Sequence, residues 1–442
     1  MGKRSKSRSR SKSVMRSSVP LTQVLVGEAR ETGNKAGEPV SPSNASRIER
    51  ASHFQWIESK PVPQVTLPWL YESHTNVVLM VVSAAVLLIP FLFEPYATMR
   101  EGLLKGGYLV TAMFLAVGIN AFPHGPFVRP HPVVWRVVFG VSLGYLVMLT
   151  SLLMLSADQM REAVNWVDGA VGQAFELPNY AADCSLTWAN VVSKMDRFVP
   201  AHFFGWLVKG LMIRHRVLLW TFSVGWELLE LSMVYAVPNF GECFWDQWIM
   251  DVLVCNGLGI EAGLYLCKYL EHKRYKWSGV LEVGTLVAKV KRSALQFTPE
   301  SWTKVEWEST GTIKRYFQVQ VLLILCLIME LNAFLLKLNL FIPTEHPWNL
   351  YRMLLVVAIA LPSIRQYYLY CVDSRVNRLG SQAVVAVLIC FAELSVIIKS
   401  LDAAAFHPPK ENVYMWLGAL FVYVLASVVL LRRRRSNKPK LL

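Results

Sequence analysis

Residues 319–338 read VQVLLILCLIMELNAFLLKL, a run whose charged side chains are Glu330 and Lys337. About 20 apolar residues cross a bilayer as an α-helix, which bonds all its own backbone polar groups. The sequence therefore predicts an all-α polytopic membrane protein with about ten transmembrane helices. Their approximate positions are 75–93, 107–122, 133–155, 201–213, 216–236, 245–267, 319–338, 351–370, 383–400 and 414–431.

The composition agrees with a membrane protein. Of the 442 residues, 54% are hydrophobic and 17% are charged, whereas a soluble domain is about a quarter charged. The first sixteen residues, MGKRSKSRSRSKSVMR, are strongly basic, and no apolar segment of a signal peptide follows them. We predict a disordered basic tail over residues 1–68, one membrane domain over 69–431, and a second basic tail over 432–442.

The distribution of charge predicts the orientation. Basic side chains on short flanking loops mark the cytosolic side, and they gather in residues 271–318 and 432–435. Both termini are then cytosolic, and the acidic loop 156–200 lies on the lumenal side. The net charge of +14 suits anionic membrane lipids and requires no nucleic acid. Lys438 and Lys440 resemble a dilysine retrieval signal, which indicates the endoplasmic reticulum membrane.

The seven cysteines show no CxxC spacing of a metal site. Most lie in or beside apolar segments and are predicted to be small core residues. Cys184 lies in the long acidic loop, and it can form a disulfide only if that loop is lumenal.

Polar residues within the apolar segments concentrate between His202 and Asn256. Charged groups inside a bilayer are costly and usually mark function. Glu227 and Glu230 are three residues apart and share a helix face. Four residues separate Glu242 from Asp246, so we expect the same of them, with Asn256 near that second face. Asp251 is half a turn away on a straight helix, so either the helix is broken there or Asp251 has a neighbouring role.

These side chains form an all-oxygen donor set, which suits a hard cation and favours Ca²⁺ over Mg²⁺. Alternatives remain for single members of the set. Asn239 follows Pro238 and could serve only as a helix cap, and the two glutamates of the first face could line a polar channel. His202 could be a hydrogen-bonded core residue, but it opens a span on the same side as the acids. The predicted metal ligands are Glu227, Glu230, Asn239, Glu242, Asp246 and Asp251.

The two longest characteristic stretches are PNFGECFWDQWIMDVLVCNGLGI (238–260) and AHFFGWLVKGLMIR (201–214). With further stretches in order along residues 70–440, they resemble the eukaryotic base-exchange phosphatidylserine synthases, and the ethanolamine-exchanging branch more than the choline-exchanging one. This resemblance implies a phosphatidyltransferase that makes phosphatidylserine from L-serine and phosphatidylethanolamine or phosphatidylcholine, with Ca²⁺ as cofactor. A second copy of the chain is a candidate partner. The matching stretches are RPHPVVWR (129–136), AHFFGWLVKGLMIR (201–214), WELLEL (226–231), PNFGECFWDQWIMDVLVCNGLGI (238–260), YLEHKRYKW (269–277), LQFTPESW (295–302), MELNAFLLK (329–337) and PSIRQYY (362–368).

The resemblance also assigns roles to individual residues. His202 is the expected catalytic residue, the acids and Asn239 match essential positions, and Asn256 is expected to bind substrate. His202 would act as general base on the serine hydroxyl or, alternatively, as a nucleophile that forms a phosphatidyl-enzyme. Positions that match family residues linked to activity or product feedback lie on the predicted cytosolic side, where regulation is the expected role: Arg129, His131, Arg292, Gln296 and Arg365.

Two other functions fit the sequence less well than a base-exchange synthase. A CDP-alcohol phosphotransferase needs the motif DGxxAR, and Asp168-Gly169 lacks that continuation. A cation or amino-acid transporter would also place acids inside the membrane, but it typically shows internal repeats, which this sequence does not show.

Overall fold

The computed structural model describes residues 81 and 99–436, except 124, 128, 176–179, 196–197, 236, 273–282, 298–301, 303, 310, 374–375, 377 and 402–407. The described residues form helices and no strand, which confirms the all-α prediction. The longer helices are α5 (Met99–Ala121), α6 (Pro132–Leu152), α7 (Ala157–Val167), α9 (Phe198–Ile213), α10 (Arg216–Met233), α11 (Gly257–His272), α13 (Ile313–Asn339), α14 (Pro347–Val372), α15 (Ser381–Ser400) and α16 (Lys410–Ser436). The shorter ones are α8 (Trp188–Lys194), η2 (Pro238–Phe240), η3 (Asp246–Asn256), α12 (Leu286–Ala294) and η4 (Leu295–Phe297).

Six helices of the described part are long and apolar enough to cross a membrane, which confirms a multi-pass protein. α5 and α9 contain shorter apolar helices, and α10 has the length of a span but carries three charged side chains. Nine of the ten predicted spans coincide with helices; the total of about ten stays a prediction. Outside the described residues lie the tail 1–68, the predicted span 75–93 apart from residue 81, and the lysines of the C-terminal signal.

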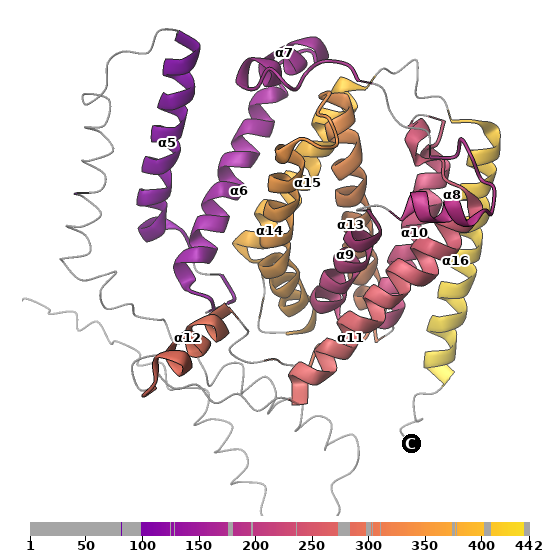
Figure 1. Cartoon of the computed structure of the whole chain (residues 1–442). Coiled ribbons are helices and arrows are strands. Elements are labelled where there is room, and N and C mark those ends of the chain that lie inside the picture. The colour runs from indigo at the N-terminus through magenta and orange to yellow at the C-terminus, as the bar shows by residue number, and fades with distance from the viewer. Residues whose placement is uncertain are drawn as a thin grey trace, which may run out of the picture. The chain divides into compact units, whose positions relative to one another are not determined.

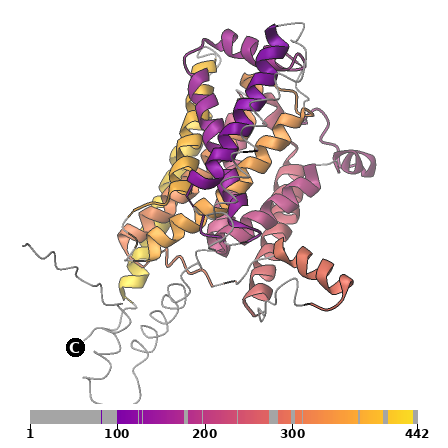
Figure 2. The same cartoon turned by 90° about the vertical axis from the view of Figure 1, so that its left-hand side faces the viewer.

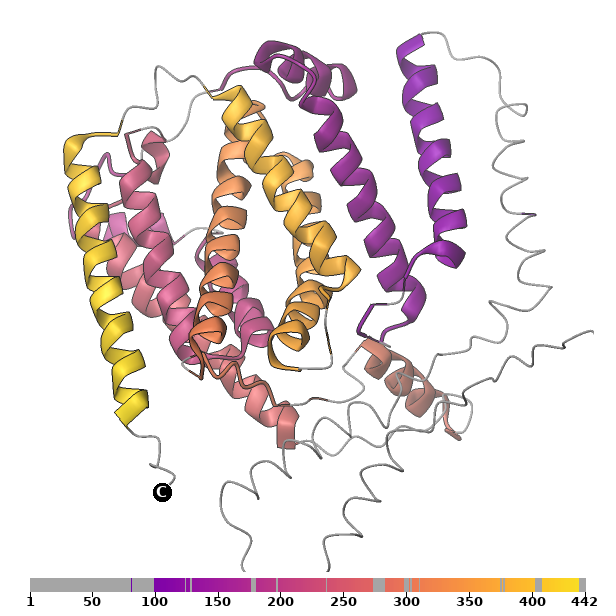
Figure 3. The same cartoon turned by 180° about the vertical axis from the view of Figure 1, so that it is seen from behind.

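The helices pack in two neighbouring groups within the unit that spans residues 62–442 (Figure 1). α9, α10, η3 and α11 contact one another, and α15 packs against α6, α13 and α14. Figure 3 shows α13 beside α15 from behind, and α10 joins the two groups because it also contacts α13. α8 and α12 stand out from the same side of the helices in Figure 2.

Glycines bring α9 and α11 unusually close together. A Cβ atom on Gly259 would lie 2.5 Å from the Phe203 carbonyl oxygen, and one on Gly263 would lie 2.6 Å from the Leu207 carbonyl oxygen. The spacing Gly-x-x-x-Gly on one helix is a common solution for close packing in membranes, where small residues let backbones touch. The two helices are therefore held at backbone contact along the segment that follows His202.

A buried ion pair fixes the second group of helices. Arg352 on α14 donates two hydrogen bonds to the carboxylate of Glu393 on α15, with distances of 2.7 Å and 2.6 Å. The hydroxyl of Tyr145 on α6 donates to the same carboxylate at 2.6 Å. Glu393 is fully buried, and a buried charge is tolerated only when it is paired and hydrogen-bonded in this way. This triad joins three helices away from the acidic segment.

We expect Gly263→Ala to lower the free energy of unfolding by about 1–3 kcal/mol, and with it the melting temperature of the purified protein, because overpacking at a backbone contact forces the helices apart. Gly205→Ala on α9 is the matched control, since its added Cβ would meet nothing within 4 Å. Thermal unfolding in detergent measures both. Equal melting temperatures for the two variants would contradict the tight α9–α11 contact.

Candidate active site

Three helices bring the predicted polar residues together. His202 lies in the first half of α9, Glu227 and Glu230 lie in the second half of α10, and the remaining acids lie on or just before η3. Glu227 is fully buried and Glu230 is 9% exposed, so the shared face predicted for these two glutamates points into the protein. The site is built where α9, α10 and η3 contact one another.

Residues 246–256 form a π-helix instead of an α-helix. A π-helix bonds each N–H to the carbonyl five residues back, so residues five apart lie near each other on successive turns. Asp246, Asp251 and Asn256 are spaced five apart. The wider turn brings Asp251 towards Asp246 and Asn256. The helix is therefore not broken at Asp251, as one alternative predicted, but changes from α to π winding.

The prediction that Glu242 and Asp246 share a helix face is wrong. Glu242 lies in the non-helical segment 241–243, after the short turn η2 and before the helix that leads into η3. Pro238 starts that turn, and no side chain caps it, so the capping role considered for Asn239 is not observed. Glu242 still belongs to the site, because its carboxyl group lies close enough to Asp251 for the two groups to interact electrostatically.

Among the predicted site residues, His202 and Asp251 form a histidine–carboxylate pair. The Nδ1 atom of His202 lies 3.3 Å from Oδ1 of Asp251. Both side chains are partly accessible, with 30% and 13% of the side chain exposed. A carboxylate beside one imidazole nitrogen orients the ring and leaves the other nitrogen for chemistry. Asp251 therefore supports the histidine rather than standing apart from the site.

Asn256 holds Glu227 in place. Its Nδ2 atom donates to Oε1 of Glu227 at 3.2 Å and to the Ser223 hydroxyl at 3.1 Å, and the asparagine is 1% exposed. The backbone carbonyl of Glu227 also accepts a hydrogen bond from Gln247. Asn256, which lies on η3 with Asp246 and Asp251, thus also contacts the first acidic face, and these hydrogen bonds position the Glu227 carboxylate.

Sequence reasoning missed Lys194. Its Nζ atom lies 3.9 Å from Oδ2 of Asp246, so a cation from α8 partly balances the acids. The sequence held a weak signal, because Lys194 comes eight residues before His202. Ser223 was missed as well; it lies four residues before Glu227 on the same helix face.

Glu242 lies outside the membrane-spanning helices, where burial and the neighbouring Asp251 raise its pKa to about 9.

The oxygen donors of the acidic segment are of the type that binds a hard cation, but their side chains do not surround one point. Within the described ranges, no group of three or more His, Cys, Asp or Glu side chains is arranged to hold a metal ion. Three buried oxygens of the predicted site residues nevertheless have no hydrogen-bond partner among the described residues: Oε2 of Glu227, Oδ1 of Asn239 and Oδ1 of Asn256. Buried polar atoms normally find a partner, and a hard cation such as Ca²⁺ prefers such carboxylate and amide oxygens.

A disulfide joins the acidic segment to the preceding loop. Cys184 is bonded to Cys243, the residue after Glu242, across 59 positions of sequence. The other five cysteines are free, and four of them are buried, as expected for core residues. The bond fixes the segment that carries Glu242 and leads into η3.

The residues with an expected regulatory role lie elsewhere. Arg129 donates to the Leu295 carbonyl at 3.3 Å, Gln296 donates to the Pro130 carbonyl at 2.9 Å, and Arg292 donates to Gln296 at 3.1 Å. His131 accepts from the Val133 N–H and caps α6, and burial lowers its pKa, which favours the neutral ring. The cluster is therefore formed by the start of α6 and the end of α12. Arg365 lies on α14, with its guanidinium over the Tyr368 ring.

A family model described as phosphatidyl serine synthase matches residues 130–401, which include the entire acidic site. The chain belongs to this family. A phosphatidylserine synthase of Drosophila melanogaster is 36% identical over 412 residues, covering 91% of this chain and 82% of the fly protein. Phosphatidylserine synthase 1 of Danio rerio is 37% identical over 397 residues, covering 88% and 84%.

A third relative carries a different name. CDP-diacylglycerol–serine O-phosphatidyltransferase 2 of Oryza sativa subsp. japonica is 36% identical over 377 residues, covering 81% of this chain and 89% of the rice protein. The first name gives the product and the second gives the transfer of a phosphatidyl group to serine, and this family member is a phosphatidyltransferase. The rice protein's name states CDP-diacylglycerol as the donor, whereas the fly and zebrafish names state no donor, and the family alone does not fix it.

We expect Asp251→Asn to reduce the turnover number for phosphatidylserine formation by about 100-fold or more. An acid–base residue contributes about 10²–10⁴ in rate, and in this variant His202 would lose the carboxylate that orients its ring. Steady-state assays of the purified enzyme would measure this loss, with the KM for serine little changed. Asp158→Asn is the matched control, since that side chain is 92% exposed. Wild-type turnover in Asp251→Asn would mean that the histidine works without it.

Proposed function

We propose that this enzyme makes phosphatidylserine by base exchange, in which L-serine replaces the ethanolamine or choline head group of a phospholipid. The observation that carries the proposal is the His202–Asp251 pair at 3.3 Å, which adjoins buried carboxylates on α10. A proton acceptor next to an electrostatic site for a phosphate is the arrangement that phosphoryl exchange requires. Phosphatidylethanolamine is our first choice of donor, because the sequence resembles that branch more closely.

The histidine would act through its second nitrogen. Nδ1 faces Asp251, so Nε2 is available to take the proton of the serine hydroxyl. The serine oxygen attacks phosphorus, the bond from phosphorus to the ethanolamine oxygen breaks, and that oxygen takes the proton from His202. One phosphodiester replaces another, so no nucleotide is consumed. If His202 is instead a nucleophile, a phosphatidyl-enzyme labelled from the lipid would be trapped by rapid denaturation.

The oxygen ligands would hold Ca²⁺, which supplies positive charge for the phosphate oxygens in the transition state. Glu227, Asn239 and Asn256 offer unpartnered buried oxygens. Glu242 and Asp251 lie close enough to interact electrostatically, so both carboxylates could turn towards one ion. Glu230 and Asp246 complete the proposed set, with Lys194 limiting how much negative charge builds up without the ion.

We also propose that the site faces the lumen of the endoplasmic reticulum and that both termini are cytosolic. The Cys184–Cys243 disulfide supports this orientation, because such bonds persist in oxidising compartments. The basic loop and C-terminal arginines support it from the opposite side. The cluster of Arg129, Arg292 and Gln296 would then lie on the cytosolic side, where we propose a regulatory role. A homodimer remains a proposal as well.

A second candidate function uses CDP-diacylglycerol as the phosphatidyl donor, and the name of the rice relative favours it. The same histidine would activate serine, and the leaving group would be cytidine monophosphate. Against this candidate, the chain lacks the DGxxAR motif that CDP-alcohol phosphotransferases need.

Purified protein in liposomes distinguishes the donors. With labelled L-serine and phosphatidylethanolamine we expect labelled phosphatidylserine and one free ethanolamine per product, while CDP-diacylglycerol gives none. His202→Ala should lower the rate by about 100-fold or more. Labelled lipid formed only with CDP-diacylglycerol would overturn base exchange, and serine uptake into the liposomes without labelled lipid would favour a transporter.

We expect Ca²⁺ removal by a chelator to abolish exchange and re-addition of Ca²⁺ to restore it. Glu227→Gln should raise the Ca²⁺ concentration needed for half-maximal rate by about tenfold, because one charged ligand is lost. Isothermal titration with Ca²⁺ gives the affinity independently of turnover. Glu162→Gln, an acid of α7 outside the site, is the control. Full activity in chelator would rule out the metal.

A further inference from the structure

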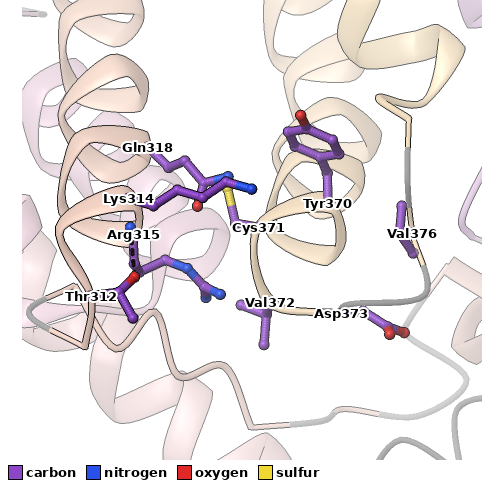
Figure 4. Close-up of a pocket in the computed structure, with 9 residues that line it drawn as sticks. All are labelled: Thr312, Lys314, Arg315, Gln318, Tyr370, Cys371, Val372, Asp373 and Val376. Atoms are coloured by element: carbon purple, nitrogen blue, oxygen red, sulfur yellow. Dashed lines mark hydrogen bonds between the residues drawn. The ribbon is translucent and has the colours of Figure 1, made fainter.

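A pocket of about 410 Å³ lies between the start of α13 and the end of α14, away from the acidic site. Figure 4 shows the Arg315 side chain extending from α13 towards the end of α14. The active site uses α9, α10 and η3, so this pocket belongs to different elements. Its lining residues are Thr312, Lys314, Arg315, Gln318, Tyr370, Cys371, Val372, Asp373 and Val376.

The guanidinium of Arg315 is incompletely satisfied. Its Nε and Nη1 atoms are shielded from solvent and have no hydrogen-bond partner within the described residues. An unpartnered buried donor costs about 1–3 kcal/mol, and more when it is charged. The backbone around it is in contrast well satisfied, since the Arg315 N–H donates to the Thr312 hydroxyl, which caps α13. Arg315 thus lines the pocket with a guanidinium two of whose donors no described residue pairs.

The charge of the lining selects the class of ligand. Lys314 and Arg315 are cationic and Asp373 is anionic, so these three side chains sum to one positive charge. A phosphodiester carries one negative charge, and the planar fork of an arginine binds two phosphate oxygens at once. The pocket also lies at the N-terminus of the 27-residue helix α13, where the helix dipole favours an anion.

The position of the pocket points to a lipid as the source of that phosphodiester. α13 and α14 are both long and apolar enough to cross the membrane, and the pocket lies where one begins and the other ends. Helices of 27 and 26 residues, at about 1.5 Å per residue, are longer than the hydrocarbon core of a bilayer, so their ends can reach the depth of the lipid phosphates. Val372, Val376 and Tyr370 add apolar surface to the lining. We propose that this pocket binds the phosphodiester of a phospholipid head group, through Arg315 and Lys314, outside the catalytic site.

Delipidated full-length protein in nonionic detergent tests the proposal, with the apparent dissociation constant taken from ligand-dependent thermal stabilisation. The probes are dioctanoyl phosphatidylglycerol, glycerophosphoglycerol, which has the same head group without acyl chains, and dioctanoylglycerol, which has no phosphate. We expect the phospholipid to stabilise the wild type, and less so as salt rises. Arg315→Gln should weaken its binding by about tenfold or more.

Two controls locate the binding. Arg378→Gln removes an exposed arginine that follows α14 and does not line the pocket. His202→Ala changes the active site. Both variants should bind the phospholipid like the wild type. If Arg315→Gln does not fold, Arg315→Lys keeps the charge and removes the fork, and we expect it to weaken binding several-fold.

The outcomes separate the sources. Stabilisation by glycerophosphoglycerol as strong as that by the lipid would support the phosphodiester site and overturn its assignment to a lipid. Equal stabilisation by dioctanoylglycerol, wild-type affinity in Arg315→Gln, or loss of binding in His202→Ala would overturn the proposal.

Discussion

The backbone contact between α9 and α11 is the constraint on which the rest of the site depends. In a membrane, apolar side chains gain little by leaving lipid for protein, so helices associate through close packing and polar contacts. Gly259 and Gly263 provide that packing against Phe203 and Leu207. Because His202 immediately precedes Phe203, the same contact sets how far its ring lies from the helix that carries Asp251.

The π-helix is the second requirement, and it explains why this segment gives up regular α-helical hydrogen bonding. A π-helix is rare and tends to occur at functional sites. Here its wider turn brings Asp246, Asp251 and Asn256 closer together than an α-helix would. Glu227 and Asn256, which contact each other, each keep one buried oxygen without a partner among the described residues, so both the backbone and the side chains carry a local cost. Such costs persist where the surrounding structure holds them, and function is the usual reason.

The sequence predicted the helices well because each apolar run must satisfy its own backbone in lipid. It also predicted the shared face of Glu227 and Glu230, since α10 keeps a regular period. The position of Glu242 was predicted wrongly, because a four-residue spacing was assigned to a helix that begins only after Cys243. Asp251 stayed undecided because sequence does not reveal a change from α to π winding. Lys194 was missed because its contact with Asp246 joins a loop helix to a distant segment, which no local period encodes.

The disulfide between Cys184 and Cys243 has a consequence for how the molecule matures. Membrane helices can form one by one during insertion, whereas this bond links segments 59 residues apart and can close only after both have emerged on the same side. Before it closes, the segment with Glu242 samples many more arrangements. A chain made where thiols stay reduced would therefore have its helices in place, while the segment with Glu242 stayed less constrained. The ordering of that part of the site then depends on an oxidation step after insertion, which the helices themselves do not need.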